Sequence, residues 1–451
     1  MKHAMRAMRA LGLVALTAGA LTACGGGSSS PPPAPGGPVT YTVGGTLSGL
    51  AAGASVVLQN SGADTLRLTA DGAFTFASAV PAGSAYDVTV QTQPTNERCT
   101  VTNASGSAKA DVTTVQVTCD PRELVFTVDN ASASVSAFSV LSSGALAPIQ
   151  GSPFATGNSP TSVAINAAAT RVFVANKSDN NVSVFSIGAD GALTPVPGSP
   201  FATGQAPTSV AVNPAGTLAF VTNQTDSTIS VFSIAASGAL SAVPGSPFAT
   251  GAGPISVAVN GTGTLALVLN QNADTVSSYS VAGNGALTQV AGPLPSTGAV
   301  PSDIAVNPAG TLAIVTNNFG NDVSVYSIGA GGALTEVTGS PFTSGRGPES
   351  VAFNGTGTQA YVADFNDDTV SVYSVSNSGG LTQVPGSPFT SGSGPNSVAI
   401  NASDTLAFVT NFNDSTITVY SIAADGALTQ ISGSPFATGA LPVGVAVATR
   451  P

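Results

Sequence analysis

Charged side chains that interrupt a repeating pattern are the groups in this sequence most suited to chemistry. Most copies of the repeat described below have Pro-x-Ser before an apolar segment, but one copy has Pro301-Ser302-Asp303 and the next has Arg346-Gly347-Pro348-Glu349. An arginine can bind a carboxylate or an oxyanion, and a nearby carboxylate can act as a base. Arg346, Glu349 and Asp303 are therefore candidates for catalytic residues. The alternative is an incidental Arg–Glu pair on a solvated rim, because exposed charges mostly contribute little.

The remaining inventory of reactive side chains is short. The only histidine is His3, which lies in a leader segment, so the rest of the chain has no histidine-based triad and no histidine metal site. The three cysteines, Cys24, Cys99 and Cys119, are assigned below to an anchor and a disulfide. We predict no metal and no cofactor, and the catalytic residues stay unassigned beyond the three candidates above.

The candidates lie within a unit of 47 residues that occurs seven times. A glycine marks the register of each copy, at Gly151, Gly198, Gly245, Gly292, Gly339, Gly386 and Gly433. The second copy divides into four short β-rich segments, Ser162–Asn166, Arg171–Asn176, Asn181–Ile187 and Gly191–Val196, separated by turn residues. A four-stranded unit of this length is typical of a propeller blade.

The two ends of the repeat array complement each other. The first copy starts at Leu124 with its second strand, whereas the last copy continues into an extra segment, Val443–Ala448, that matches a first strand. This extra strand is expected to complete the first blade and to close the ring, which hides two strand edges. The sequence therefore predicts an all-β chain with a seven-bladed β-propeller over residues 123–451.

The wording of the repeats adds a family resemblance. Each copy contains variants of GAL-T-x-V, G-x-P, P-x-S-V-A-V-N-P-x-G and A-F-V-T-N-x-x-D-x-T-V-S-V-Y. These motifs resemble the seven-bladed lactonase propellers, which include the 6-phosphogluconolactonase and carboxymuconate-cyclising branch and relatives with Tyr-Val-Thr-Asn repeats. The resemblance covers Glu123 to Pro451 and implies lactone hydrolysis by histidine, arginine and glutamate at the mouth of the channel. This sequence has no histidine there to carry over.

The N-terminus has the order of features found in exported proteins. Lys2, Arg6 and Arg9 precede an apolar stretch, and Leu21-Thr22-Ala23-Cys24 resembles a bacterial lipobox. We expect residues 1–23 to be a signal peptide and Cys24 to carry a lipid anchor, the alternative being an ordinary signal peptide with an incidental cysteine. The residue after the cysteine is Gly25 and not the aspartate associated with retention in the inner membrane, so the resemblance favours the outer membrane. Residues 24–39, which are rich in Gly, Ser and Pro, would then be a tether.

Residues 40–120 have the pattern of a separate small domain. About seven alternating segments, from TYTVGGTL to TTVQVTC, predict a β-sandwich. The segments Gly53–Val56 and Thr69–Phe74 resemble carboxypeptidase-regulatory or transthyretin-like modules, a resemblance that implies a stalk or a binding module. Cys99 and Cys119 are predicted to form a disulfide, because an exported protein resides in an oxidising compartment; two free buried thiols are the alternative.

Composition limits the possible partners. Of the 11 basic residues, Lys2, Arg6 and Arg9 lie in the leader, which leaves 8 basic against 22 acidic residues and a net charge of −14. Such a chain would repel nucleic acid and anionic headgroups. We expect a monomer that is bound to the membrane through Cys24 and that takes an unknown small-molecule or protein ligand at the propeller face.

Two repeated polar features have structural and functional interpretations. Asp179, Asp226 and their counterparts in other copies favour turn capping over a calcium site, since the pattern recurs throughout the array. Asp129 and Asp364 replace the usual asparagine at a third repeated position, and we expect them on the same face as the candidate site.

Three functions fit these patterns. The preferred interpretation is a lipoprotein of the cell envelope, located at the outer membrane, in the periplasm or at the cell surface, whose propeller is a binding or scaffold module. The second is a lactone hydrolase acting on an extracytoplasmic lactone, and the third is a surface adhesion or structural protein.

Overall fold

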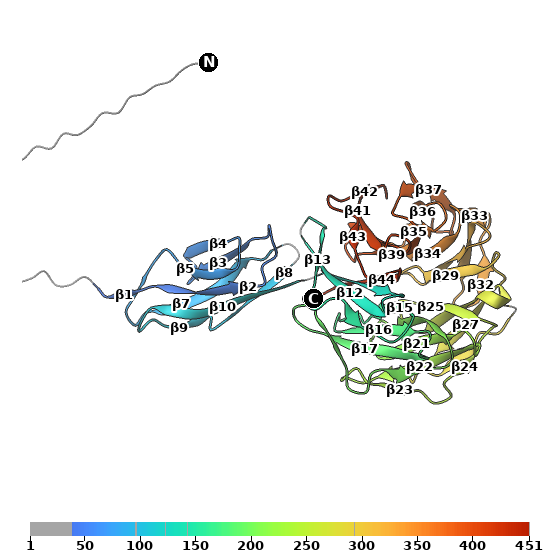
Figure 1. Cartoon of the computed structure of the whole chain (residues 1–451), viewed down its shortest axis with the longest axis horizontal. Coiled ribbons are helices and arrows are strands. Elements are labelled where there is room, and N and C mark those ends of the chain that lie inside the picture. The colour runs from blue at the N-terminus through green and yellow to red at the C-terminus, as the bar shows by residue number, and fades with distance from the viewer. Residues whose placement is uncertain (1–37, 95–96, 122, 142, 293, 451) are drawn as a thin grey trace, which may run out of the picture.

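The computed structural model describes residues 38–450 except 95, 96, 122, 142 and 293, and it is almost entirely β-structure. The predicted signal peptide, Cys24 and most of the tether lie outside the described residues. Among the residues described, no helix has the length and apolar character needed to cross a membrane. Figure 1 shows two bodies along the long axis, a narrow N-terminal one and a broad ring of sheets.

The N-terminal body is a β-sandwich of two four-stranded sheets. One sheet has the order β5-β2-β10-β8 and the other β4-β3-β7-β9, while β1 and β6 form a short pair. The strands are β1 (Thr40–Tyr41), β2 (Val43–Ser48), β3 (Val56–Asn60), β4 (Asp64–Leu68), β5 (Gly72–Thr75), β6 (Val80–Pro81), β7 (Ala85–Thr92), β8 (Glu97–Thr102), β9 (Ser105–Ser107) and β10 (Val112–Pro121). Alternate residues of β2, β3 and β10 point inward and form the apolar core between the sheets.

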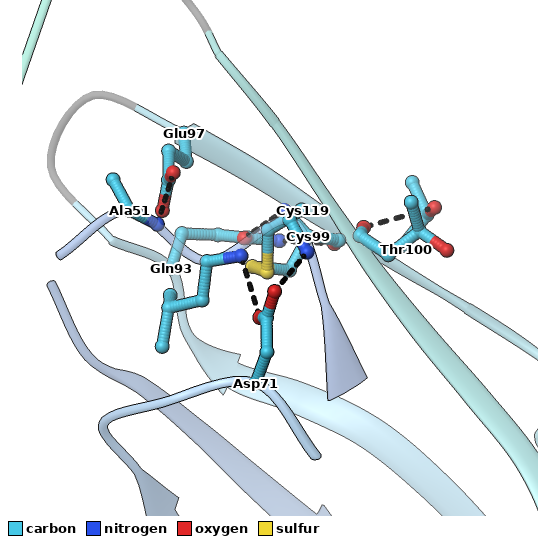
Figure 2. Close-up of a disulfide and its surroundings, with 10 residues drawn as sticks. Ala51, Asp71, Gln93, Glu97, Cys99, Thr100 and Cys119 are labelled. Atoms are coloured by element: carbon cyan, nitrogen blue, oxygen red, sulfur yellow. Dashed lines mark hydrogen bonds between the residues drawn. A yellow bond between two sulfur atoms is a disulfide. The ribbon is translucent and has the colours of Figure 1, made fainter. Parts of the chain in front are cut away.

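A disulfide joins Cys99 to Cys119 across the neighbouring strands β8 and β10. Both cysteines are buried, and Figure 2 shows them beside Gln93, whose amide bonds both backbone groups of Cys99. In the same view Glu97 accepts a hydrogen bond of 2.7 Å from the backbone N–H of Ala51. The bridge thus ties two strands of one sheet at the end of the sandwich nearest the ring.

The ring is the predicted propeller. The described part of the chain contains seven sheets of this second body, and successive innermost strands contact one another all the way round. From the centre outward, the first blade has the order β44-β11-β12-β13, and the other six have four consecutive strands each. The prediction of an all-β fold with a seven-bladed propeller is therefore confirmed.

The strands of the blades have the following bounds. The innermost strands are β44 (Pro442–Thr449), β15 (Pro160–Ile165), β20 (Pro207–Val212), β25 (Pro254–Val259), β29 (Pro301–Val306), β34 (Pro348–Phe353) and β39 (Pro395–Ile400). The second strands are β11 (Glu123–Asp129), β16 (Arg171–Asn176), β21 (Leu218–Asn223), β26 (Leu265–Asn270), β30 (Leu312–Asn317), β35 (Gln359–Asp364) and β40 (Leu406–Asn411). The third strands are β12 (Ser134–Val140), β17 (Asn181–Ile187), β22 (Thr228–Ile234), β27 (Thr275–Val281), β31 (Asp322–Ile328), β36 (Thr369–Val375) and β41 (Thr416–Ile422). The outermost strands are β13 (Leu146–Pro148), β18 (Leu193–Pro195), β23 (Leu240–Ala242), β28 (Leu287–Gln289), β32 (Leu334–Glu336), β37 (Leu381–Gln383) and β42 (Leu428–Gln430).

The ring closes through the last strand of the chain. β44 pairs antiparallel with β11, with Val447 opposite Val125, so the first blade combines the two ends of the array. Figure 1 shows this red strand beside the blue-green first blade. Apolar side chains then pack between the first and last blades, as they do between other neighbours: Phe138 shares a cluster with Phe408 and Ile417.

Each blade except the fourth also has a short fifth strand that the sequence pattern did not predict. These strands are β14 (Phe154–Ala155), β19 (Phe201–Ala202), β24 (Phe248–Ala249), β33 (Phe342–Thr343), β38 (Phe389–Thr390) and β43 (Phe436–Ala437), and each pairs with the third strand. The serine of the preceding Gly-Ser-Pro anchors the segment; Ser199 Oγ, for example, accepts a hydrogen bond from the Val184 N–H. In the fourth blade, where Pro295 replaces the phenylalanine, a single bridge between Thr275 and Ser296 remains, next to a 3-10 turn, η1 (Gln271–Ala273).

Asp129 and Asp364 lie inside their blades, not on the face where we expected them. Both are fully buried at the ends of second strands, and hydroxyl groups surround them. Asp364 accepts hydrogen bonds from Ser371 Oγ at 2.6 Å and from Ser344 Oγ at 2.8 Å. Asparagine at this position makes equivalent bonds in other blades, as Asn411 does with Ser391. Burial is the main cause that raises the pKa of Asp364, to about 6.

Replacing Asp364 with asparagine should stabilise the protein at neutral pH. Because the folded-state pKa of Asp364 is raised, the folded chain holds a proton between about pH 4 and pH 6 that the unfolded chain releases, and stability falls as the pH rises through this window. Asp364→Asn removes that loss, so we expect a gain of about 1–3 kcal/mol at pH 7.5 and a smaller gain at pH 4.5. Thermal unfolding at the two pH values measures it.

The reverse substitution, Asn411→Asp, is the matched control. It places the acid in the equivalent pocket of the seventh blade and should lower the melting temperature at pH 7.5 more than at pH 4.5. Equal effects of either substitution at both pH values would contradict a raised pKa of the buried aspartate.

Candidate functional site

A β-bulge begins each innermost strand and determines which side chains face the channel. In β34, Pro348 pairs with Asp364 and Ser350 with Ala363, which leaves Glu349 as the extra residue. A bulge places two successive side chains on one side of a strand that otherwise alternates. Glu349 and Ser350 therefore both line the central cavity, which has a volume of about 340 Å³.

Two rings of side chains result from the repeated bulge. The upper ring, which is the one closer to the start of the innermost strands, holds the bulged residues Thr161, Thr208, Ile255, Ser302, Glu349, Asn396 and Val443. The lower ring holds the residues that follow them, Ser162, Ser209, Ser256, Asp303, Ser350, Ser397 and Gly444. The wall of the cavity is thus mostly hydroxyl groups, with two carboxyl groups that belong to the neighbouring strands β29 and β34.

The hydroxyl groups join each blade to the next. Ser162 Oγ accepts a hydrogen bond of 3.1 Å from the Val210 N–H of the following innermost strand, and Ser397 Oγ accepts one of 3.2 Å from the Val445 N–H. In the upper ring, Ser302 Oγ donates to the Pro348 carbonyl at 2.7 Å. Serine and threonine therefore dominate the wall for a structural reason, and residues of other types at these positions are the informative ones.

Asp303 occupies a serine position and keeps the serine's contact. Its Oδ2 accepts a hydrogen bond from the Val351 N–H at 3.1 Å, as a serine oxygen does in other blades. Its Oδ1 accepts from Ser256 Oγ at 2.8 Å and from the Ile304 N–H at 2.9 Å. Burial raises the pKa of Asp303, and these donors act in the opposite direction by stabilising the ionised form.

Glu349 has far fewer donors than Asp303. Among the described residues its side chain has one hydrogen bond, 2.7 Å from Asn318 Nδ2 to Oε1, and Oε2 has no hydrogen-bond partner there. Burial, followed by repulsion from Asp303, raises the pKa of Glu349 to about 7. Because Asp303 has the donors, we infer that it carries the negative charge of the pair while Glu349 exchanges its proton near neutral pH. A carboxyl group with that property can act as a base or as an acid.

Arg346 does not join these two carboxyl groups. Its side chain is 72% exposed, and its Nε lies 2.6 Å from Asp367 Oδ1 in the adjacent loop. It does not line the cavity, although it precedes Glu349 by only three residues. The structure thus brings Asp303 and Glu349 together and leaves Arg346 in an exposed loop outside the cavity.

The repeated aspartates of the Asn-x-x-Asp segments make loop contacts. Asp179 and Asp226 each accept a hydrogen bond of 2.7 Å from the backbone N–H of a residue in the loop before the innermost strand, namely Asn158 and Gln205. Across the described ranges, no three His, Cys, Asp or Glu side chains lie close enough together to hold a metal ion.

Sequence reasoning missed a third ring of residues, which lies at the mouth of the channel outside the cavity lining and which we call the rim. A rim residue directly follows the last residue of each second strand, and its backbone N–H donates to the carbonyl of the residue before the Pro that begins the innermost strand of the same blade. The rim residues are Asn130, Lys177, Gln224, Gln271, Asn318, Phe365 and Phe412. Some of these side chains bond the next blade, as Asn318 does at Glu349 and Gln271 does at the Pro301 carbonyl. Variation at this one repeated position was the signal that could have identified them.

Comparison with known proteins identifies the family. The family profile described as "Lactonase, 7-bladed beta-propeller" matches residues 86–198, 195–300 and 250–442, which together span most of the chain. The chain belongs to the seven-bladed β-propeller lactonase family. No curated protein sequence matches it.

Solved structures of this lactonase fold superimpose on the ring. A periplasmic gluconolactonase of Pseudomonas aeruginosa is 18% identical, with a TM-score of 0.63, and the alignment covers 73% of this chain and 99% of that one. A protein of Bacteroides fragilis that was proposed to be a 6-phosphogluconolactonase is 19% identical, with a TM-score of 0.62 and coverage of 72% and 98%. At these identities the likeness concerns the fold.

The assigned carboxyl pair can be tested by titration. Asp303→Ser installs the residue that most blades have at this position and removes the neighbouring charge, so the pKa of Glu349 should fall below 7. It should stay above its ordinary value of about 4.3 because the burial remains. The chain has four glutamates, Glu97, Glu123, Glu336 and Glu349, so ¹³C-carboxyl labelling of glutamate resolves them by NMR, with Glu349→Gln for assignment. An unchanged Glu349 titration in Asp303→Ser would contradict the coupling.

Proposed function

We propose that this protein hydrolyses a lactone at the mouth of the central channel, with Glu349 as the general base. The observation that carries the proposal is the carboxyl pair of Glu349 and Asp303 in the cavity of a lactonase-family propeller. A base is most effective when its pKa lies near the working pH, and the pKa of Glu349 is raised to about 7.

The arrangement suggests a sequence of proton transfers. Ionised Glu349 takes a proton from a water molecule through its unbonded Oε2, and the resulting hydroxide adds to the lactone carbonyl. Asn396, the neighbouring residue of the upper ring, has an amide that can donate to the oxyanion. The intermediate collapses with cleavage of the ring C–O bond, and protonated Glu349 returns its proton to the leaving alkoxide. The product is a hydroxy acid.

This proposal replaces the scaffold interpretation favoured by the missing histidine. The absence of histidine after His3 excludes a histidine base, but it leaves the glutamate route open. Family membership and the raised pKa of Glu349 both favour the lactonase alternative.

Glu349→Gln should abolish most lactone hydrolysis. Glutamine keeps the hydrogen bond with Asn318 available but cannot accept a proton, so we expect kcat to fall about 100-fold or more. In the wild type, kcat/KM should rise with pH through about 7 and then level off, because the ionised form of Glu349 is the active one. Both effects are measured with a panel of lactones, in which the release of protons reports the rate of ester hydrolysis.

Glu336→Gln is the control for this experiment. Glu336 is an exposed glutamate on the outermost strand β32, far from the channel in the order of the sheet. Its substitution should leave the rate unchanged. Turnover that survives in Glu349→Gln, or a panel without any turnover above buffer, would reject Glu349 as the base or reject the activity, respectively.

We also propose that the mature protein is anchored to the outer membrane through a lipidated Cys24. The support is the order of basic residues, apolar stretch and lipobox-like Leu21–Cys24 in the sequence. Cys24→Ser should abolish incorporation of labelled fatty acid and move the protein from the detergent phase to the aqueous phase in Triton X-114 partitioning. Unchanged partitioning of the serine variant would contradict the anchor.

A further inference from the structure

The rim is asymmetric, and the asymmetry lies beside Glu349. The first five rim residues, Asn130, Lys177, Gln224, Gln271 and Asn318, are polar, whereas the last two, Phe365 and Phe412, are aromatic. Since the seven positions are equivalent in the repeat, packing within the blade requires no particular residue type there. The change from amide to phenyl side chains in two adjacent blades is therefore a feature of the mouth, not of the fold.

Phe365 and Phe412 form one continuous apolar surface. Their ring centroids lie 6.0 Å apart at an interplanar angle of 54°, and both side chains are only partly buried. Phe365 extends from the sixth blade over Gly394 of the next one, where a Cβ would come within 3.1 Å of its Cε2. We call these two rings the aromatic shelf. Phe319, which is 74% exposed, lies on the same face in the preceding loop.

The aromatic shelf begins next to the proposed base. The Phe365 N–H donates to the Gly347 carbonyl at 2.9 Å, and Gly347 is two residues before Glu349. Asn318 approaches Glu349 from the preceding blade. Glu349 thus receives an amide from the preceding blade, and the backbone just before it is bonded to the first residue of the aromatic shelf.

Charge at this part of the mouth disfavours an anionic ligand. Asp303 and Glu349 are both acids. The nearest cation in the sequence, Arg346, pairs with Asp367 in an exposed loop outside the cavity. The rim's one cation in the described residues, Lys177, belongs to the second blade, three blades beyond the sixth in the ring. A phosphate or carboxylate group beside Glu349 would meet repulsion without a paired cation.

We propose that the substrate is an uncharged lactone with an aromatic ring, held by stacking on Phe365 and Phe412 while its ester lies over Glu349. This inference rests on the proposed lactone hydrolysis and specifies its substrate class. Aromatic rings bind one another through offset or tilted stacking, and the polar wall of the cavity is left for the ester and its hydrating water.

The test compares two neutral lactones in the full protein. Dihydrocoumarin carries a fused aromatic ring, whereas δ-valerolactone has the same ester ring without it. Phe365→Gln with Phe412→Gln installs the residue found at the rim of the third and fourth blades, so the fold is expected to be preserved. We expect KM for dihydrocoumarin to rise about tenfold in this double variant, with kcat little changed and δ-valerolactone hydrolysis altered less than about twofold.

Lys177→Gln is the matched rim control and should change neither substrate. If the double variant hydrolyses dihydrocoumarin with the wild-type KM, the aromatic shelf is not the binding surface, although the lactonase activity stands. If wild-type protein prefers δ-valerolactone, the inferred substrate class is overturned as well.

A binding measurement separates this inference from the proposed activity. The chain contains no tryptophan, so the fluorescence of 7-methoxycoumarin, an aromatic lactone that resists opening, can be followed without interference. Binding should weaken about tenfold in the double variant, and the 3-carboxylate derivative should bind about tenfold more weakly than the neutral probe at pH 8. Shelf-dependent binding without hydrolysis of any lactone would sink the proposed activity but keep the aromatic site. Binding unaffected by the double variant would overturn that site.

Discussion

The pairing of β44 with β11 is the constraint on which the rest of the structure depends. It joins residues from the two ends of the array in one sheet, with Val447 opposite Val125. Without this pairing, the first blade would lack its innermost strand, and the edge of β11 that β44 covers would be exposed. The channel exists only because seven innermost strands surround it, so the candidate site on β29 and β34 also depends on closure at the far side of the ring.

Repetition explains most of the polar groups in the ring. Buried asparagines bond hydroxyl groups at the ends of second strands, serines of the lower ring bond the next blade, and loop aspartates cap backbone N–H groups. These contacts recur because each blade faces the same packing problem. Function is therefore to be sought where a blade departs from the others, and the departures discussed above lie in the fifth, sixth and seventh blades, at Asp303, Glu349, Phe365 and Phe412.

The acid–base character of Glu349 follows from an imbalance between two neighbours. Asp303 substitutes for a serine and inherits its backbone N–H donor, which favours the ionised form even though the group is buried. Glu349 occupies the bulge, receives one amide donor and faces the charge of Asp303. Two carboxyl groups in one cavity thereby acquire different protonation behaviour without any cation, which is compatible with a chain that has no histidine after residue 3.

The sequence by itself determined the period of 47 residues, the strand pattern, the closure by Val443–Ala448 and the family, because these depend on local patterning that repeats along the chain. It also singled out Asp303 and Glu349, since a charged residue that replaces the usual residue of a repeat can be recognised in the sequence alone. Only the tertiary structure decided that Arg346 turns to Asp367, that Asp129 and Asp364 are buried within their blades, and that Asn318, Phe365 and Phe412 border the same mouth. The direction of a side chain at a bulge or a loop depends on contacts with other strands or loops of the same blade or of the next blade, and the partners are 21 to 48 residues away in the sequence.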